Sequence, residues 1–246
     1  MADILLITGL SGAGRSGAAA VLEEAGKFCA GTLHPINRSM DEEGARLVNG
    51  EVKTPAGFAE AYRAFAAGGW TALSADPEYG GQGLPFILQL WLDEMLSASN
   101  VSFQLVPGLS RGAAEAIAAH ASDDLKTIYL PKLVSGEWTG AMALTEGGAG
   151  TDLALLKTKA SPLGDGSYAV TGQKIFISTG DHDFGGNVIH LVLARLPDAP
   201  EGVKGISLFL VPKFLVNDDG TLGARNGMSV GCAWMPIFSS SEPTDM

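Results

Sequence analysis

The fold is decided by the stretch MALTEGGAGTD at residues 142–152. Its apolar start predicts a β-strand, and the three glycines that follow predict a turn with little side-chain bulk. Such a turn lets the backbone approach a flat or anionic ligand, and Thr145 and Thr151 supply hydroxyls for hydrogen bonds. The residues alone leave two interpretations open, a ligand-binding turn and a plain wide turn between two strands.

A second segment, GQKIFISTG at residues 172–180, has the alternation of a strand. It predicts a hairpin that turns at Gly172-Gln173. Alternation would place Lys174, Phe176 and Ser178 on one face, where the aromatic ring could stack on a ligand and the hydroxyl could donate to it. The alternative is an ordinary half-buried strand, which the segment in isolation favours.

The chain changes character near residue 138. Before it, apolar residues recur at helical spacing: Phe58, Tyr62 and Phe65 share one face of a helix that Gly68-Gly69 ends. After it, short runs of Val, Ile, Leu and Phe alternate with turns, which is typical of an antiparallel barrel or sandwich. The sequence therefore predicts an α+β fold, a helical domain followed by an antiparallel β-barrel.

Composition excludes several classes of protein. The 246 residues include 16 basic and 27 acidic side chains, for a formal net charge of −11, which argues against a nucleic-acid-binding surface. No apolar run reaches the roughly 20 residues of a membrane span, and no basic residue precedes the apolar residues 4–7, so we expect no signal peptide. Cys29 and Cys232 are too few for a disulfide framework and fit a reducing compartment. We therefore expect a cytoplasmic protein.

A phosphate loop is a further candidate, at the N-terminus. GLSGAGRS at residues 9–16 fits that pattern, except that Arg15 replaces the lysine. Backbone N–H groups at a helix N-terminus would hold the phosphates, with Arg15 and Ser16 beside them. Because no later strand offers a clear Mg²⁺-binding aspartate, a glycine-rich leader before the first helix is favoured over a nucleotide binder.

The triplet Asp181-His182-Asp183 has the residue types of a metal site. His34, His120 and His190 are scattered along the chain and form no ligand spacing with it. We therefore expect a solvated loop at the triplet and no metal.

The two glycine-containing segments resemble signature motifs of one enzyme family. Residues 145–152 look like the Thr-Glu-Pro-Gly-Ala-Gly-Ser-Asp signature of acyl-CoA dehydrogenases, and residues 172–180 are similar to the family's second flavin segment. The resemblance covers about residues 18–226, and its finer detail is similar to the branch that includes 3-(methylthio)propanoyl-CoA dehydrogenase. Gly147 departs from the pattern, because the family usually has proline there.

The resemblance implies a helical domain, a middle β-barrel and a C-terminal four-helix bundle. On that division, residues 1–17 are an unassigned leader, 18–138 the helical domain, 139–226 the barrel and 227–246 a divergent tail. The bundle, which carries the family's catalytic glutamate, is expected to be missing, so no catalytic residue is named, and Glu146 belongs to the turn. We expect a truncated, catalytically incomplete acyl-CoA dehydrogenase; the alternative is a non-enzymatic remnant or interaction module.

The implied cofactor is FAD. The residues expected to contact it, carried over by position, are Met142, Leu144, Thr145, Gly150, Thr151, Phe176 and Ser178. The first three line the flavin ring, the next two meet its phosphate side, and Thr151 also meets the acyl-CoA substrate. The aromatic ring packs against the isoalloxazine, and the serine bonds near its reactive edge. The implied reaction is α,β-dehydrogenation in fatty-acid β-oxidation, with an electron-transferring flavoprotein as electron acceptor and a homo-oligomer as the family's assembly.

Overall fold

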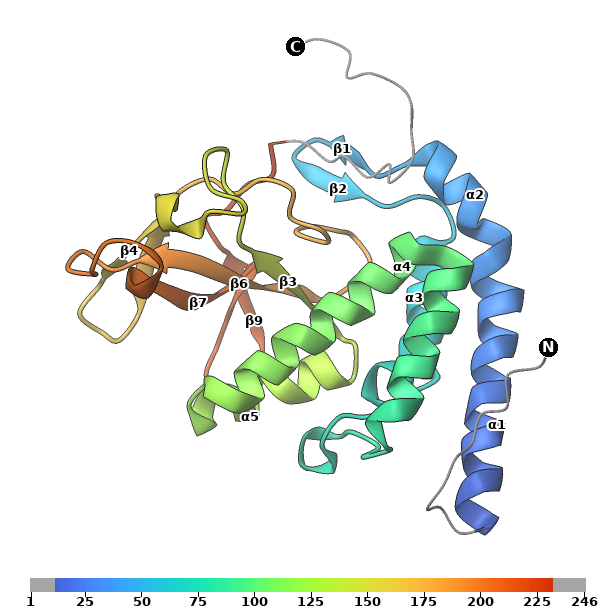
Figure 1. The fold of residues 1–246 in the computed structure, drawn as a ribbon. Coiled ribbons are helices and arrows are strands. Elements are labelled where there is room, and N and C mark those ends of the chain that lie inside the picture. The colour runs from blue at the N-terminus through green and yellow to red at the C-terminus, as the bar shows by residue number, and fades with distance from the viewer. Residues whose placement is uncertain (1–11, 232–246) are drawn as a thin grey trace.

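The main sheet follows the helices along the chain, as the sequence predicts (Figure 1). A computed structural model describes residues 12–231. The helical half contains α1 (Gly12–Phe28), a π-helical turn (Cys29–Leu33), α2 (His34–Glu43), the hairpin β1 (Arg46–Val48) and β2 (Glu51–Lys53), α3 (Phe58–Ala67), α4 (Phe86–His120) and α5 (Asp123–Val134). None of these described helices combines the length and the apolar character of a membrane span.

The second half is built around one mixed sheet. Its strands are β3 (Trp138–Ala143), β4 (Lys159–Pro162), β5 (Tyr168–Thr171), β6 (Asn187–Arg195) and β7 (Ile206–Pro212). Strand β6 is central, because it pairs with β3, with β7 and, at its last residue, with β4. A separate hairpin follows, formed by β8 (Phe214–Val216) and β9 (Leu222–Arg225).

The strand directions correct the prediction of an antiparallel barrel. The pairs β4–β5 and β6–β7 are antiparallel, but β3 runs parallel to β6, with Trp138 opposite Asn187 and Ala143 opposite Val192. The chain leaves the end of β3, makes a long excursion through residues 144–186, and returns to the start of the neighbouring strand. Such a crossover is what a parallel pair requires, and short turn signals along the chain do not reveal it.

The predicted apolar face of α3 is confirmed. Phe58, Tyr62 and Phe65 are each at most 2% exposed. All three rings pack on Phe103 of α4, with ring centroids 5.5, 6.4 and 5.5 Å apart. These aromatic contacts form the centre of the helical core.

Helix α4 changes direction sharply at Asn100 (Figure 1). Asn100 leaves helical geometry (φ −163°, ψ 92°), and its side-chain oxygen accepts a hydrogen bond of 3.0 Å from the Phe103 N–H. The asparagine thus acts as an internal N-cap for the second half of the helix. An ion pair of 2.6 Å between Asp93 and Arg111 links the two halves across the bend.

The second half of α4 lies directly against β3. The Gly140 N–H donates to the Ser110 hydroxyl at 2.9 Å, which ties the strand to the helix. A Cβ atom at Gly140 would lie only 2.4 Å from the Ala113 Cβ. The absence of a side chain at residue 140 is therefore what lets helix and sheet meet.

We predict that Gly140→Ala lowers the free energy of unfolding by about 2 kcal/mol, because helix and strand must separate. Urea denaturation measures this change. Gly112→Ala is the matched control: it lies on the same helix, and its Cβ would meet nothing within 4 Å. The control should be neutral or slightly stabilising, since alanine favours helix. Equal losses in both variants would contradict the packing argument.

Candidate functional site

The glycine-rich stretch after β3 forms a tight turn. Glu146 N–H donates to the Ala149 carbonyl at 2.9 Å, and Ala149 N–H donates back to the Glu146 carbonyl at 3.1 Å. Gly147 and Gly148 form the tip, where an added Cβ would meet nothing within 4 Å. The next element is a 3₁₀ turn, Leu153–Leu155, and not the strand that a wide connecting turn would join.

The Glu146 carboxylate is an internal anchor. It accepts hydrogen bonds from Lys157 N–H (2.7 Å), Thr158 N–H (3.0 Å), the Thr158 hydroxyl (2.5 Å) and Lys174 Nζ (2.9 Å). Burial raises its pKa, but the bonds from Thr158, Lys174 and Lys157 outweigh that effect and lower the pKa to about 2. Glu146 is therefore ionised and fully engaged, so it does not serve as a catalytic base.

The predicted hairpin at Gly172-Gln173 is wrong. Strand β5 pairs instead with β4, and residues 172–180 form no strand. Gly172 packs against Thr158 so closely that a Cβ would lie 2.3 Å from the hydroxyl oxygen. Phe176 and Thr179 have positive φ angles of 57° and 55°. Left-handed residues break the extended alternation on which the prediction rested.

As a result, the side chains of residues 174–178 do not share the predicted face. Lys174 turns inward to Glu146 and is 10% exposed, whereas the Phe176 side chain is 79% exposed and Ser178 is also exposed. The segment runs beside the turn: Ile175 N–H donates to the Thr145 carbonyl at 2.9 Å. Lys174 also donates to the Leu144 carbonyl, at 3.1 Å.

These bonds bring the two predicted flavin segments side by side. Met142, Leu144 and Thr145 are half-buried, and Met142 packs against the core between α4, α5 and the sheet. Gly150 and Thr151 are exposed just beyond the turn. The exposed Phe176 ring and Ser178 hydroxyl therefore belong to a segment that lies beside the turn with Gly147 and Gly148 at its tip.

The prediction of a solvated loop at Asp181-His182-Asp183 is wrong for Asp181 and His182. The Asp181 side chain is 3% exposed and pairs with Lys213, and His182 is 3% exposed. His182 Nδ1 accepts from Gly185 N–H at 3.4 Å, so Nε2 carries the proton and donates to the Thr139 hydroxyl at 2.6 Å. Asp181 and His182 thus form a buried polar junction, whereas Asp183 is exposed.

Phe184 explains why this junction is buried. Its ring stacks on His182 at 3.8 Å and packs against Phe58 and Tyr62 of α3, at 5.0 and 4.7 Å. Asp183 accepts hydrogen bonds from both the N–H and the hydroxyl of Thr54, at 3.2 and 2.7 Å. In the described part of the chain, no group of three His, Cys, Asp or Glu side chains is arranged to hold a metal ion.

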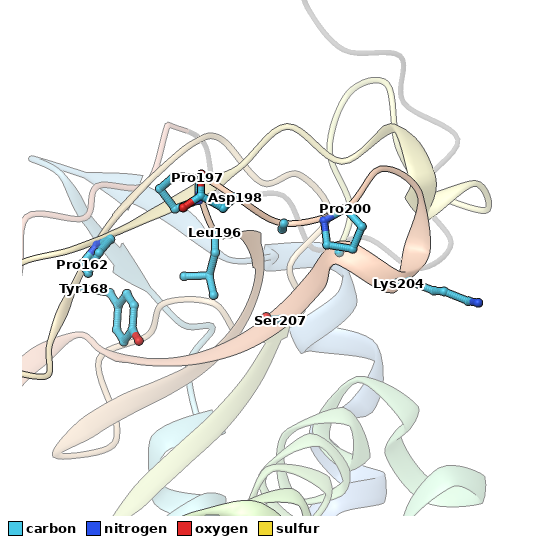
Figure 2. Close-up of a pocket in the computed structure, with 10 residues that line it drawn as sticks. Pro162, Tyr168, Leu196, Pro197, Asp198, Pro200, Lys204 and Ser207 are labelled. Atoms are coloured by element: carbon cyan, nitrogen blue, oxygen red, sulfur yellow. The ribbon is translucent and has the colours of Figure 1, made fainter.

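A separate hollow of about 410 Å³ lies between the β4–β5 hairpin and the loop that joins β6 to β7 (Figure 2). Pro162, Tyr168, Leu196 and Pro200 give it mostly apolar walls, and Figure 2 shows Lys204 extending away from it. None of its lining residues belongs to the two flavin segments.

The phosphate-loop candidate falls partly outside the described residues. Residues 9–11 are not described, and the backbone of residues 12–16 forms the start of α1. The Arg15 side chain also lies outside what the structure describes.

Comparisons with known proteins match nearly the whole chain. The family model "Acyl-CoA dehydrogenase, N-terminal domain" matches residues 15–137, and "Acyl-CoA dehydrogenase, middle domain" matches residues 141–234. The chain is 47% identical to 3-methylmercaptopropionyl-CoA dehydrogenase of Ruegeria pomeroyi, over 87% of this chain and 36% of that protein. It is 41% identical to a butyryl-CoA dehydrogenase of Syntrophomonas wolfei, over 82% and 34%. The chain thus spans about a third of the length of these relatives.

Solved structures agree with these matches. The acyl-CoA dehydrogenase of Geobacillus kaustophilus superposes with a TM-score of 0.64 at 27% identity, covering 83% of this chain and 49% of that one. A Bacillus anthracis acyl-CoA dehydrogenase complexed with FAD gives a TM-score of 0.66 at 22% identity, covering 85% and 32%, a likeness of fold. None of these matches favours a nucleotide-binding phosphate loop.

We predict that Glu146→Gln lowers the free energy of unfolding at neutral pH by about 3 kcal/mol, because it leaves the buried Lys174 unpaired. The control is Glu137→Gln, whose partner Lys132 is at the surface; it should cost less than about 1 kcal/mol. The folded pKa of Glu146 is about 2 against an ordinary value of 4.5. Its stabilisation is therefore complete above pH 4.5 and disappears as the pH falls toward 2. A wild-type–variant difference that stays constant over this range would contradict the assignment.

His182 should make the fold sensitive to mild acid. Burial, with help from the nearby Lys213 charge, lowers its pKa from 6.5 to about 3. Below pH 6.5 this histidine binds a proton in the unfolded chain but not in the folded chain. The free energy of unfolding therefore falls by about 1.4 kcal/mol per pH unit until the folded group titrates. In urea titrations from pH 7 to 4, His182→Gln should show a shallower loss than wild type. His120→Gln, at the exposed end of α4, should keep the wild-type slope.

Proposed function

Because the chain belongs to the acyl-CoA dehydrogenase family, we propose that it forms the flavin-ring side of an FAD-dependent acyl-CoA dehydrogenase. That enzyme would carry out the α,β-dehydrogenation of an acyl-CoA thioester. One observation carries the proposal: the Ile175–Thr145 backbone bond and the Lys174–Glu146 pair hold the two flavin segments side by side. The site residues remain those that the resemblance implies.

The residues present fit a flat, partly anionic cofactor. Gly147 and Gly148 are exposed, and an added Cβ at either would meet nothing within 4 Å, so a ligand can approach the backbone of the turn closely. Phe176, 79% exposed, offers an apolar face that water covers at a free-energy cost, and a stacked ring would remove that cost. FAD, when bound, supplies the acceptor for the two electrons that leave the substrate.

Each proposed residue has a defined task. Thr145 and Ser178 would donate hydrogen bonds along one edge of the ring, where donors favour added negative charge. Phe176 would exclude water from one ring face. Gly150 and Thr151, exposed past the turn, would meet the phosphate side, and the Thr151 hydroxyl would also contact the acyl-CoA. Glu146 holds the turn and does not take the substrate's α proton, because its carboxylate already accepts four hydrogen bonds.

The relatives guide the choice of substrate and electron acceptor. The named substrates of the two relatives above, methylmercaptopropionyl-CoA and butyryl-CoA, both have short acyl chains. We therefore infer a short-chain acyl-CoA and, as acceptor of the electrons, an electron-transferring flavoprotein. The low cysteine count supports a cytoplasmic location for this reaction.

We predict that the purified chain binds FAD saturably and that Phe176→Ala weakens the binding about tenfold, because the stacking surface is lost. Flavin fluorescence and visible circular dichroism measure the affinity. Leu163→Ala removes another exposed apolar side chain, 61% exposed beside β4, and should leave the affinity unchanged. A folded chain that shows no saturable FAD binding would instead support the non-enzymatic alternative.

A further inference from the structure

A second turn, at residues 176–180, carries Phe176 and Ser178, and its backbone is strained. Phe176 and Thr179 both adopt left-handed backbone angles, with φ of 57° and 55°. Non-glycine residues avoid that region, and a bulky aromatic residue avoids it strongly. Such a conformation persists only where the surroundings over-determine it. The contacts on both sides of the turn must therefore hold it.

Two backbone carbonyls fix the end of the turn. His190 lies between two backbone carbonyls, with Nε2 2.6 Å from that of Gly180 and Nδ1 3.1 Å from that of Val211, and a neutral ring donates to one of them. The buried Thr179 side chain points toward β3, where its hydroxyl lies 3.5 Å from the Gly140 carbonyl as a donor. Both contacts join the last residues of the turn to strands of the sheet, His190 from β6 and Gly140 from β3.

Asp181 closes a polar ring directly after the turn. Its carboxylate accepts from Lys213 Nζ at 2.5 Å and from the His182 N–H at 2.9 Å. The same ammonium donates to the His182 carbonyl at 3.0 Å. Lys213 thus binds the His182 carbonyl directly and the His182 N–H through Asp181, which restrains the backbone just after Gly180.

The ion pair is poorly suited to a purely stabilising role. The Asp181 side chain is 3% exposed and Lys213 is 13% exposed, so both charges lose hydration. The second carboxylate oxygen of Asp181 is buried without a hydrogen-bond partner, and the Arg225 guanidinium lies 3.7 Å from it. A buried ion pair that leaves an oxygen unsatisfied contributes little net stability. The contacts of the other carboxylate oxygen, by contrast, are specific: it binds Lys213 Nζ and the His182 N–H.

We propose that Asp181 is a positioning residue for the flavin site: through Lys213 it fixes the chain after Gly180 and thereby keeps Phe176 and Ser178 in their presented orientation. The role in flavin binding rests on the proposed function, whereas the effect of Asp181 on the conformation of the turn does not. Asp181 touches neither cofactor nor substrate in this proposal. It acts only through the backbone of the turn.

The test compares Asp181→Asn with a matched control, Asp183→Asn, in the full chain. Asp183 is the same residue type two positions on, but it bonds to Thr54 and makes no contact with the turn. Amide hydrogen exchange is measured for the peptide that covers residues 175–181 and for a reference peptide from α3. In Asp181→Asn, exchange of the turn peptide should rise about tenfold while the α3 peptide is unchanged. Asp183→Asn should leave the turn peptide at the wild-type rate.

Lys213→Met provides a second variant, since loss of the cation should loosen the same peptide. Equal acceleration in the turn and in α3 would mean global destabilisation and would overturn the positioning role, as would an unchanged turn peptide. If Asp181→Asn does not fold, Lys213→Met decides by the same two peptides; failure of both variants to fold would show that the pair serves the whole fold and would also overturn the proposal.

A titration with FAD separates this inference from the proposed function. If wild type binds FAD, Asp181→Asn should weaken the binding about tenfold, and Asp183→Asn should not. If wild type does not bind FAD, the proposed function of this chain fails. The exchange data then still decide whether Asp181 positions the turn.

Discussion

The ion pair between Glu146 and Lys174 is the contact on which the candidate site depends. It joins two segments that lie 28 positions apart, the glycine turn and the start of the Phe176 turn. The same carboxylate also accepts from Lys157 and Thr158, at the approach to β4. Three stretches of the excursion between β3 and β6 therefore meet at one buried charge. Because each bond ends on the same two oxygens, displacement of one stretch would disturb the others.

This arrangement reverses the usual placement of residue types. A carboxylate and an ammonium are inside, while a phenylalanine is 79% exposed. Burying the charges is tolerated because donors saturate the carboxylate. Because these polar contacts hold the loop together, the glycine tip and the Phe176 ring are not needed for that purpose. A loop that is held from within in this way can present an apolar face outward, which a cofactor-binding surface requires.

Sequence patterns predicted what depends on near neighbours and missed what depends on distant ones. The buried face of α3 was predictable because Phe58, Tyr62 and Phe65 repeat at helical spacing. The alternation of Lys174, Phe176 and Ser178 is typical of a strand. The direction of the Lys174 side chain is set instead by its ion pair with Glu146, which is distant in sequence. Asp181 and His182 looked solvated because the residues that bury them, Lys213 and the aromatic side chains of α3, are remote in sequence. The two family signatures indicated which segments form the candidate site, although the local pattern misjudged the conformation of residues 172–180.

The helical half therefore does more than cover the sheet. Phe184 inserts among the α3 rings, and Asp183 binds Thr54 beside them. On the other side, Ser110 of α4 holds Gly140 of β3, whose carbonyl faces Thr179 of the strained turn. The stretch that follows Phe176 is thus tied to the helices directly, through Asp183 and Phe184, and indirectly, through the contact of Thr179 with β3. It follows that the conformation of the site is a property of the packed helical and sheet halves together, and that strands excised from the helices would not retain it.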